Sequence, residues 1–316
     1  MSEVEVVVGS EEHDTTVSSV VRRALAGIPW SKARDLCESG RVLVNGVVVT
    51  DSSRRVTEGA VVLVRPTAQR AASKGVLQKE ALLYADRDVV VVNKPPGTLS
   101  IPYEPDDRDT LVDTTRALLR RIEKARGKDA YDPELGIVHR LDKDTTGVMM
   151  FTRTVAAKRH VAQQFREHSI LRRYVALVHG TVRDATYEST LIRDRGDGLR
   201  GSHGVFRRAK GRPPDDAQHA VTHVRVVEHL RGASLVECQL ETGRQHQIRI
   251  HLAEAGHMLV GEPVYKREYF GKPIDAPRVM LHARLLGFVH PRKEEELSFS
   301  QDPPEDFMDL YETLAR

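Results

Sequence analysis

The chain has 316 residues, of which 40% are hydrophobic and 29% charged, and its formal net charge is +3. This length predicts one large domain or two domains, with enough apolar material for a core. No apolar run approaches the length that crosses a bilayer, and the acidic first 16 residues do not resemble a signal peptide. No Cys/His spacing predicts a zinc site, and Cys37 and Cys238 are expected to be buried apolar residues. We therefore expect a cytoplasmic protein with no membrane association and no bound metal.

Residues 16–66 predict a small α/β domain that follows an acidic tail over residues 1–15. The tail is expected to be mostly solvated, apart from a short edge strand over residues 4–8. In the domain itself, apolar residues at helical spacing are followed by apolar runs on both sides of an Asn-Gly pair, which is a strong hairpin signal. The expected elements are helices over 17–26 and 32–38, a hairpin around Asn45 and Gly46, and a strand over 61–64.

This domain resembles the small RNA-binding domain that is named after ribosomal protein S-four. The matching stretches are Ser-Lys-Ala-Arg at 31–34, Gly-Arg-Val-Leu-Val-Asn-Gly at 40–46 and the last strand, which Gly59 precedes. The resemblance implies that three cations face RNA phosphates, which attract clustered positive charge. They are Lys32, Arg34 and Arg41. The alternative is an ordinary solvated helix face.

Residues 67–80 are small, polar and basic, and predict a linker to a second domain over residues 81–316. There, strands and a few helices follow one another without regular β-α-β alternation, which indicates an α+β fold with a mostly antiparallel mixed sheet. Residues 181–218 are expected to be polar loops that are mobile or face RNA. The expected elements are strands over 82–84, 89–92, 170–179, 221–229, 234–241 and 285–289, and helices over 109–126, 155–167 and 245–255.

Residues 137–151 concentrate charge in one short turn that precedes an apolar strand. Asp142 lies between Arg140 and Lys143, two cations that would stabilise a charged carboxylate if they are close in space. One interpretation is a charged turn that Asp144 caps. The other is a reactive loop that a rigid sheet presents at a strand end. The stretch alone leaves both open.

Five stretches, taken together and in this order, resemble the RluA family of RNA pseudouridine synthases. They are Asn-Lys-Pro-Pro-Gly at 93–97, His139 to Gly147, Arg172 to Gly180, Thr242 to His251, and Met-Leu-His-Ala at 280–283. The likeness extends over residues 82–291, and a preceding RNA-binding domain also fits the family. Two positions differ: Thr146 stands where serine is frequent, and Ser100 where histidine often follows the Pro-Pro-Gly loop.

The resemblance implies that uridine within RNA is isomerised to pseudouridine. Asp142 matches the catalytic aspartate, which either attacks the sugar carbon or abstracts a sugar proton, and the sequence leaves both routes open. Arg249 matches its ion-pair partner. Tyr174 matches the tyrosine that stacks on the base and is a candidate for removing the carbon 5 proton, and Leu281 matches the apolar residue on the other side of the base.

The target nucleotide must leave the helical stack before it can react. By resemblance, Arg140 inserts into the vacated place, while Lys94 and Arg244 meet phosphates. We expect His139 to fix the loop by a hydrogen bond rather than to transfer protons. The reaction needs no metal and no cofactor, because it is an isomerisation without redox change.

Three other functions compete with this interpretation. A non-catalytic RNA-binding or ribosome-associated protein would not need Asp142, Tyr174 and Arg249 together. A base deaminase would need zinc ligands, and a methyltransferase a glycine-rich loop within a β-α-β unit. A glycosidase would use two carboxylates and has no need of the N-terminal domain. We expect ribosomal RNA of the large subunit as substrate, with transfer RNA as the alternative, and a monomer with no protein partner.

Overall fold

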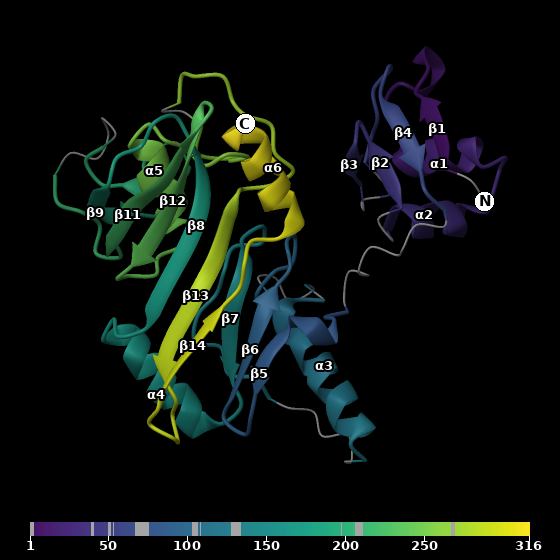
Figure 1. Ribbon diagram of the computed structural model, residues 1–316. Coiled ribbons are helices and arrows are strands. Elements are labelled where there is room, and N and C mark those ends of the chain that lie inside the picture. Colours follow the sequence, from purple (N-terminus) through teal and green to yellow (C-terminus); the bar gives the residue numbers. More distant parts are fainter. Residues whose placement is uncertain are drawn as a thin grey trace. The chain divides into compact units, whose positions relative to one another are not determined.

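The computed structural model divides the chain into two compact units, residues 1–78 and 79–316 (Figure 1). It describes residues 3–316 apart from 39–40, 50–51, 53, 67–75, 103–106, 108, 128–133, 197, 206–210 and 267–268. Most of the expected linker therefore lies outside the described residues, and the second unit begins with a short 3-10 helix, Lys79–Ala81. No helix in the described part of the chain is long and apolar enough to cross a membrane.

The N-terminal unit is a four-stranded sheet with the order β1-β4-β2-β3, packed with two helices around one core. The first helix begins after Thr16, whose side-chain oxygen accepts a hydrogen bond from the Ser19 N–H and so caps the helix. Asn45 and Gly46 have φ values of 52° and 78°, the left-handed backbone that a tight hairpin requires. The elements are β1 Val4–Val7, α1 Val17–Ala24, α2 Trp30–Glu38, β2 Val42–Val44, β3 Val47–Val48 and β4 Val61–Val64.

The edge strand expected within the acidic stretch 1–15 is present as β1, and this stretch belongs to the first compact unit. Strand β1 pairs antiparallel with β4, with Val4 opposite Val64. Val4 and Val6 are half-buried and Val8 is buried, whereas Glu5, which lies between Val4 and Val6, is exposed. An edge strand tolerates a charged outer face because that face meets water. The acidic composition therefore did not prevent pairing.

The second unit is built on a ten-stranded sheet with the order β10-β9-β11-β12-β8-β13-β7-β6-β5, and β14 pairs with β13. Among the described strands, β7 and β13 form a parallel pair, and the other pairs are antiparallel. The predicted α+β fold with a mostly antiparallel mixed sheet is confirmed. The elements are β5 Leu82–Ala85, β6 Val89–Lys94, α3 Leu111–Ala125, β7 Thr146–Thr152, α4 Val155–Arg166, β8 Leu171–His179, β9 Ala185–Ile192, β10 Gly201–Ser202, β11 Gln218–Leu230, β12 Ala233–Leu240, α5 Gln247–Glu254, β13 Leu281–Val289, β14 Glu296–Ser300 and α6 Glu305–Ala315.

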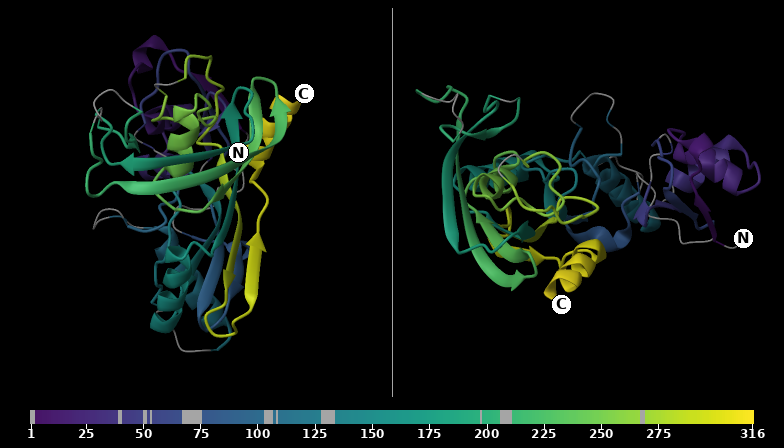
Figure 2. Two further views of the ribbon diagram at one scale, coloured as in Figure 1. Left: turned by 90° about the vertical axis from the view of Figure 1, so that its left-hand side faces the viewer. Right: turned by 90° about the horizontal axis from the view of Figure 1, so that it is seen from above.

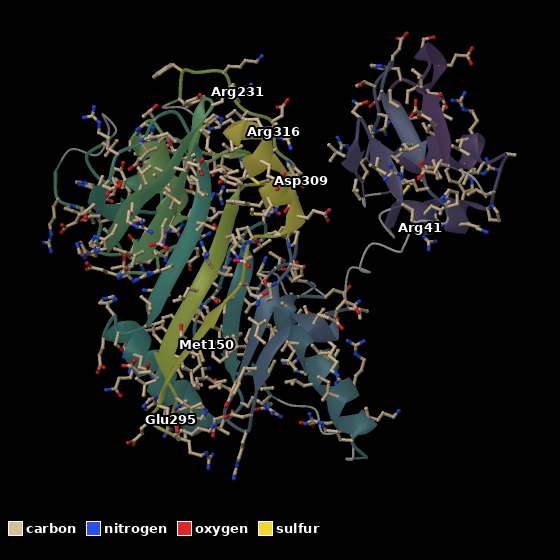
Figure 3. The ribbon with its side chains drawn as sticks, in the orientation of Figure 1. Arg41, Met150, Arg231, Glu295, Asp309 and Arg316 are labelled. Carbon is tan, nitrogen blue, oxygen red and sulfur yellow. The ribbon has the colours of Figure 1, made fainter. Side chains whose placement is uncertain are left out.

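The sheet is strongly twisted, and helices pack on both of its faces. Figure 2 shows β9 and β11 running across the direction of β6 and β14. Helix α5 packs against β11 on the face that carries Tyr174, since its His251 bonds to Thr222 there. Helix α6 packs on the opposite face, where Phe307 contacts the core around Val175. Figure 3 shows Asp309 pointing outward from α6, away from that core.

Two strands lie within residues 181–218, which were expected to be loops. Strand β9 pairs along β11, with Tyr187 opposite Thr222, and β10 pairs with the end of β9. The outer face of β9 carries Thr186 and Glu188, so its composition is that of a polar loop although its backbone is paired. Strand β14 and helix α6 were also not predicted. Residues 206–210 of the basic loop lie outside the described residues.

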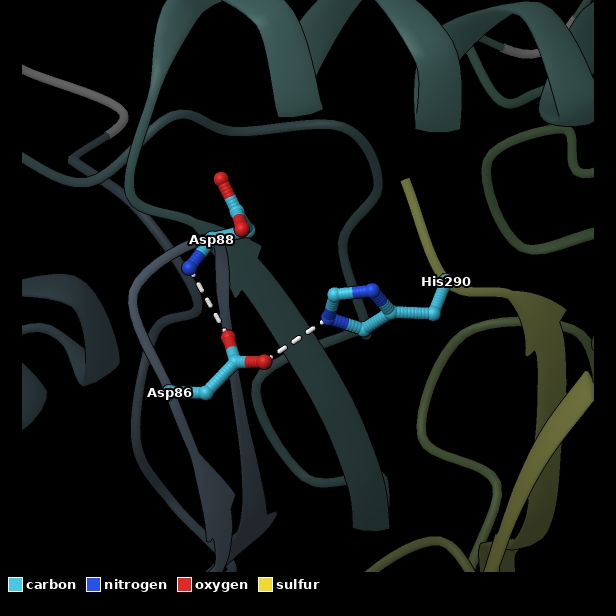
Figure 4. Close-up of side chains that lie close together, drawn as sticks. All are labelled: Asp86, Asp88 and His290. Carbon is cyan, nitrogen blue, oxygen red and sulfur yellow. Dashed lines mark hydrogen bonds and ion pairs between the residues drawn. The ribbon is translucent and has the colours of Figure 1, made fainter. Parts of the chain in front are cut away.

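A polar cluster of Asp86, Asp88 and His290 has the composition of a metal site (Figure 4). Its ligand atoms are already used within the protein. Asp86 accepts hydrogen bonds from two backbone N–H groups, from Tyr84 and from His290, and Asp88 accepts from Arg292 at 2.8 Å. Because every carboxylate has protein donors, the cluster ties the β5–β6 turn to the end of β13 rather than presenting free ligands.

Candidate active site

The charged turn ends where β7 meets β13, and Gly147 makes this junction possible. Its φ is 111°, and a Cβ built on it would lie 2.2 Å from the carbonyl oxygen of Ala283. Only glycine permits this approach, which pairs Gly147 with Ala283 in the parallel ladder. The loop before it is closed by a hydrogen bond from the Thr145 N–H to the Asp142 carbonyl oxygen (3.2 Å). Asp142 is therefore presented at the rim of the sheet.

Arg249 on α5 holds two carboxylates. Its Nε and Nη2 donate to Glu262 at 2.8 and 2.6 Å, and its Nη1 donates to Asp142 Oδ2 at 3.3 Å. The Glu262 side chain is fully buried and also accepts the N–H of Val264 and of Tyr265. Burial would raise the pKa of Glu262, but the hydrogen bonds and charge of Arg249 outweigh it and lower the pKa. Arg249 thus lies beside Asp142 as expected, and Glu262 is its closer partner.

His246 forms another side of the Asp142 environment. It has a φ of 58°, and its Nε2 lies 3.8 Å from Asp142 Oδ2. Its Nδ1 lies 2.8 Å from the hydroxyl oxygen of Tyr265, whose ring also lies below the Arg249 guanidinium at 5.3 Å. Burial lowers the pKa of His246, which favours the neutral imidazole, although the nearby Asp142 opposes this. His246 can therefore donate or accept a hydrogen bond at the mouth of the site.

Tyr174 and Leu281 lie on one face of the sheet, close to Asp142. Tyr174 on β8 pairs with Cys238 and Ala283, while Leu281 pairs with Ala176, two residues further along β8. The Tyr174 side chain is 8% exposed, and burial raises the pKa of its phenol. Its hydroxyl has no hydrogen-bond partner among the residues that the structure describes. A neutral phenol and an apolar side chain therefore flank the same space.

Two hollows meet at Asp142. One of about 60 Å³ lies between Tyr174, Leu281 and the start of α5, and the other, of about 220 Å³, extends outward along Lys143 and Asp144. The residues that line both are Arg140, Asp142, Thr145, His246 and Arg249. A larger hollow of about 710 Å³ lies around Arg173, Glu237 and Gln239, which point to the opposite face of the sheet from Tyr174.

Lys94 does not reach an RNA phosphate, so that prediction is wrong. The side chain is 1% exposed, and its Nζ donates to the carbonyl oxygens of Pro95, Lys143 and Thr145 at 3.1, 2.7 and 2.8 Å. Three acceptors match the three N–H donors of an ammonium group. Burial lowers the pKa of Lys94 to about 7, although the charges of Asp144 and Asp142 oppose the shift. Lys94 therefore supports the loop from inside.

The other predicted cations have varied positions. Arg140 is exposed beside both hollows, and Arg244 is half-buried, with its Nε donating to the His219 carbonyl oxygen at 2.9 Å. In the N-terminal unit, Lys32 and Arg34 are exposed on α2 and Arg41 is half-buried before β2.

His139 holds the loop to the sheet, as expected. Its Nε2 accepts a hydrogen bond from the Met150 N–H at 3.1 Å, and its ring stacks on Phe165 with centroids 5.0 Å apart. Burial lowers the pKa of His139 to about 3, so the ring is neutral and can accept this bond. A role in proton transfer near neutral pH does not fit this environment.

Glu262, His246 and Tyr265 were not predicted as site residues. Glu262 stands between Gly261 and Pro263, which reads locally as an exposed turn. It becomes buried because Gly261 approaches the Arg278 carbonyl oxygen, where a Cβ would lie only 1.9 Å away. A buried carboxylate partner for Arg249 could have been inferred only from the burial of Arg249 itself, which depends on long-range packing.

Comparisons with known proteins agree with this geometry. A family described as RNA pseudouridylate synthase matches residues 88–254, and an S4 domain matches residues 18–62. The chain is 34% identical to the uncharacterized RNA pseudouridine synthase YlyB of Bacillus subtilis (strain 168), over 323 residues that cover 100% of this chain and 99% of that protein. It is also 34% identical to ribosomal large subunit pseudouridine synthase D of Pseudomonas aeruginosa, over 93% of this chain and 88% of that protein.

Among solved structures, human RNA pseudouridylate synthase domain containing 4 is similar, with a TM-score of 0.58 and 23% identity over 74% of this chain and 93% of that chain. This likeness concerns the fold alone. The family match and the relatives together extend over both units of the chain. The chain therefore belongs to the RluA family of RNA pseudouridine synthases, and it is an RNA pseudouridine synthase with an N-terminal S4 domain.

Proposed function

We propose that this protein isomerises specific uridines of large-subunit ribosomal RNA to pseudouridine, with Asp142 as the catalytic carboxylate. The observation that carries this proposal is the position of Asp142. Its side chain is 21% exposed, lies where two hollows meet and is held by Arg249 at 3.3 Å. Several relatives of similar length are named ribosomal large subunit pseudouridine synthase D, which supports ribosomal RNA ahead of transfer RNA.

The geometry suggests how a flipped uridine would be bound. The base enters the smaller hollow between Tyr174 and Leu281, where an aromatic ring and an aliphatic side chain can cover both of its faces. The ribose then lies at Asp142, and the phosphates follow the outer hollow beside Arg140 and Lys143. Arg140 is exposed at this entrance, so its side chain would fill the gap in the RNA stack from which the nucleotide has flipped out.

The reaction exchanges one bond at the sugar for another. The bond between C1′ and N1 breaks, the uracil turns within the hollow, and a bond between C1′ and C5 forms. The proton on C5 is then lost and N1 gains one, so atoms and charge balance. Asp142 either attacks C1′ or removes a sugar proton in the first step, and Arg249 stabilises its carboxylate in both routes. Tyr174 is the candidate for accepting the C5 proton, directly or through water.

Tyr174→Phe tests the two roles of this tyrosine. The ring remains, so affinity for RNA should change by less than twofold, while kcat should fall by about 10²-fold if the hydroxyl transfers the C5 proton. Tyr174→Leu removes the ring as well and should cost a further 1–3 kcal/mol, roughly, of base binding. Single-turnover release of tritium from C5 and filter binding measure the two effects. An unchanged rate in Tyr174→Phe would restrict Tyr174 to stacking.

The cations of the N-terminal unit should act on affinity alone. Lys32→Ala and Arg34→Ala each remove one exposed charge, and each should lower the slope of log K against log salt by about one without changing the rate at saturating RNA. Lys94→Met, which removes a buried cation, should leave the slope unchanged. Titrations at several salt concentrations distinguish these classes. Equal slopes for all variants would argue against RNA contact by α2.

The substrate is tested by mapping pseudouridines in total RNA with and without the gene. Loss of sites confined to large-subunit ribosomal RNA is the expected result, and loss confined to transfer RNA would contradict the proposed substrate.

We also propose that the protein is a cytoplasmic monomer. Cys37 and Cys238 are both buried and form no disulfide, which fits a reducing compartment. Sedimentation of the protein tests the monomer.

A further inference from the structure

The backbone of the catalytic loop is held at every carbonyl from residue 141 to residue 145. Such complete pairing is unusual for a charged loop at a sheet rim, where water normally satisfies most carbonyls. The donors come from two distant segments, one holding Lys94 and Ser100 and the other Arg278, as well as from the loop itself. They are Ser100 Oγ to Leu141 (2.7 Å), Thr145 N to Asp142 (3.2 Å), Lys94 Nζ to Lys143 (2.7 Å) and Thr145 (2.8 Å), and Arg278 Nη1 to Asp144 (3.1 Å).

Arg278 differs from the other donors because it has a second, charged attachment. Its Nε and Nη2 form a two-pronged ion pair with Asp306 at 2.7 and 2.9 Å, while its Nη1 also donates to the Val279 carbonyl oxygen at 3.0 Å. The Arg278 side chain is 6% exposed. A planar guanidinium with this many bonds has a fixed orientation. The position of its Nη1, and so of the Asp144 carbonyl, therefore depends on Asp306.

Asp306 lies in the first turn of α6, where a carboxylate interacts favourably with the helix N-terminus. The helix itself is anchored, because Phe307 and Leu314 are buried in the core that also contains Val175 and Met280. That core lies on the opposite face of the sheet from Tyr174. The chain Phe307–Asp306–Arg278–Asp144 thus connects a packed helix behind the sheet to the loop in front of it.

We propose that Arg278 is a positioning residue, which fixes the catalytic loop to the C-terminal helix through Asp306 and so aims Asp142 at the sugar. Arg278 has no bond to the Asp142 carboxylate. It acts on the peptide two residues further on, and a small displacement there moves the carboxylate relative to C1′. A misplacement of about 1 Å can cost on the order of 10²-fold in rate. The inference rests on the proposed role of Asp142.

The test is kinetic and uses the full-length protein. Arg278→Ala should lower the single-turnover rate by about 10²-fold, with less than a threefold change in Kd for RNA. Millimolar guanidinium should raise the rate of Arg278→Ala at least tenfold, because it can occupy the vacated site between Asp306 and the Asp144 carbonyl. Urea and methylammonium at the same concentration should not. Asp306→Asn, at a side chain that is 32% exposed, should cost about tenfold.

Arg292→Ala is the matched control. Arg292 forms an equivalent two-pronged pair with Asp88 at the distant end of the sheet and has no contact with the loop. Because the Arg292 side chain is 54% exposed, against 6% for Arg278, this variant should lose less thermal stability, and it should have a normal rate and no response to guanidinium. A normal rate in both Arg278→Ala and Asp306→Ala, or a loss in Arg278→Ala that guanidinium does not relieve, would overturn the inference. If Arg278→Ala does not fold, the Asp306 variants decide the question.

The outcomes also separate this inference from the proposed function. Asp142→Asn should be inactive whether or not Arg278 positions the loop. Activity retained in Asp142→Asn would reject Asp142 as the catalytic residue, and with it the reason to position the loop. Inactivity of Asp142→Asn together with a normal rate in Arg278→Ala would leave the proposed function intact and reject only the positioning role.

Discussion

Asp142→Asn should abolish pseudouridine formation while leaving RNA affinity nearly unchanged. The substitution keeps the size of the side chain and a hydrogen-bond acceptor for Arg249, but it removes the charge that attacks the sugar or takes its proton. A loss of 10²–10⁴-fold, roughly, is the scale for removing such a group, and the loss should lie at the upper end or beyond it. Single-turnover assays on ribosomal RNA, with binding measured on the same RNA, separate the two effects.

Asp144→Asn is the control for this experiment. Asp144 is two residues away in the same loop and lines only the outer hollow among the two that meet at Asp142. Its neutralisation should change the rate by less than about tenfold, the effect of a nearby charge rather than of a reacting group. A larger loss of rate in Asp144→Asn than in Asp142→Asn would identify Asp144, rather than Asp142, as the catalytic carboxylate. Loss of binding with normal turnover in Asp142→Asn would contradict a catalytic role for it.

Glu262→Gln should be among the most destabilising single changes in the site. It neutralises a fully buried carboxylate and leaves Arg249, whose side chain is 8% exposed, with Asp142 as its remaining charged partner. Breaking one side of a buried pair costs about 3–5 kcal/mol. Glu188→Gln is the contrast, since Glu188 and His219 form an exposed pair, which is worth roughly 0–1 kcal/mol. Urea unfolding of the three proteins measures both differences, and equal midpoints would contradict the prediction.

The difference in unfolding free energy between wild type and Glu262→Gln should depend on pH in a defined direction. The pKa of Glu262 is lower in the folded protein than its ordinary value of 4.5, because Arg249 outweighs the effect of burial. Its contribution to the free energy of unfolding is therefore fully present above pH 4.5 and is lost as the pH falls through the folded pKa. The difference between wild type and Glu262→Gln should be constant from pH 5 to 7, roughly, and should shrink in more acidic buffer.

Local patterns were sufficient for much of the fold. The helical spacing after Thr16, the Asn45-Gly46 turn and the alternation along β8 are properties of short segments, and each forms the element that its pattern predicts. Charge patterns were less reliable. The polar face of β9 predicted a solvated loop, because one side of this strand meets water. Its pairing partner, β11, lies about 30 residues further along the chain, where no local pattern reveals it.

The sequence by itself determined which residues could react: a carboxylate in a charged turn, a strand tyrosine and a helix arginine, in the order of one enzyme family. Tertiary structure alone decided what surrounds them. It buries Lys94 against three carbonyls, adds Glu262 to Arg249 and brings Arg278 to Asp144. The physical reason is that the sequence specifies a charged residue but not whether its side chain is solvated or paired with a buried group. Only the packing of distant segments determines which of these environments it occupies.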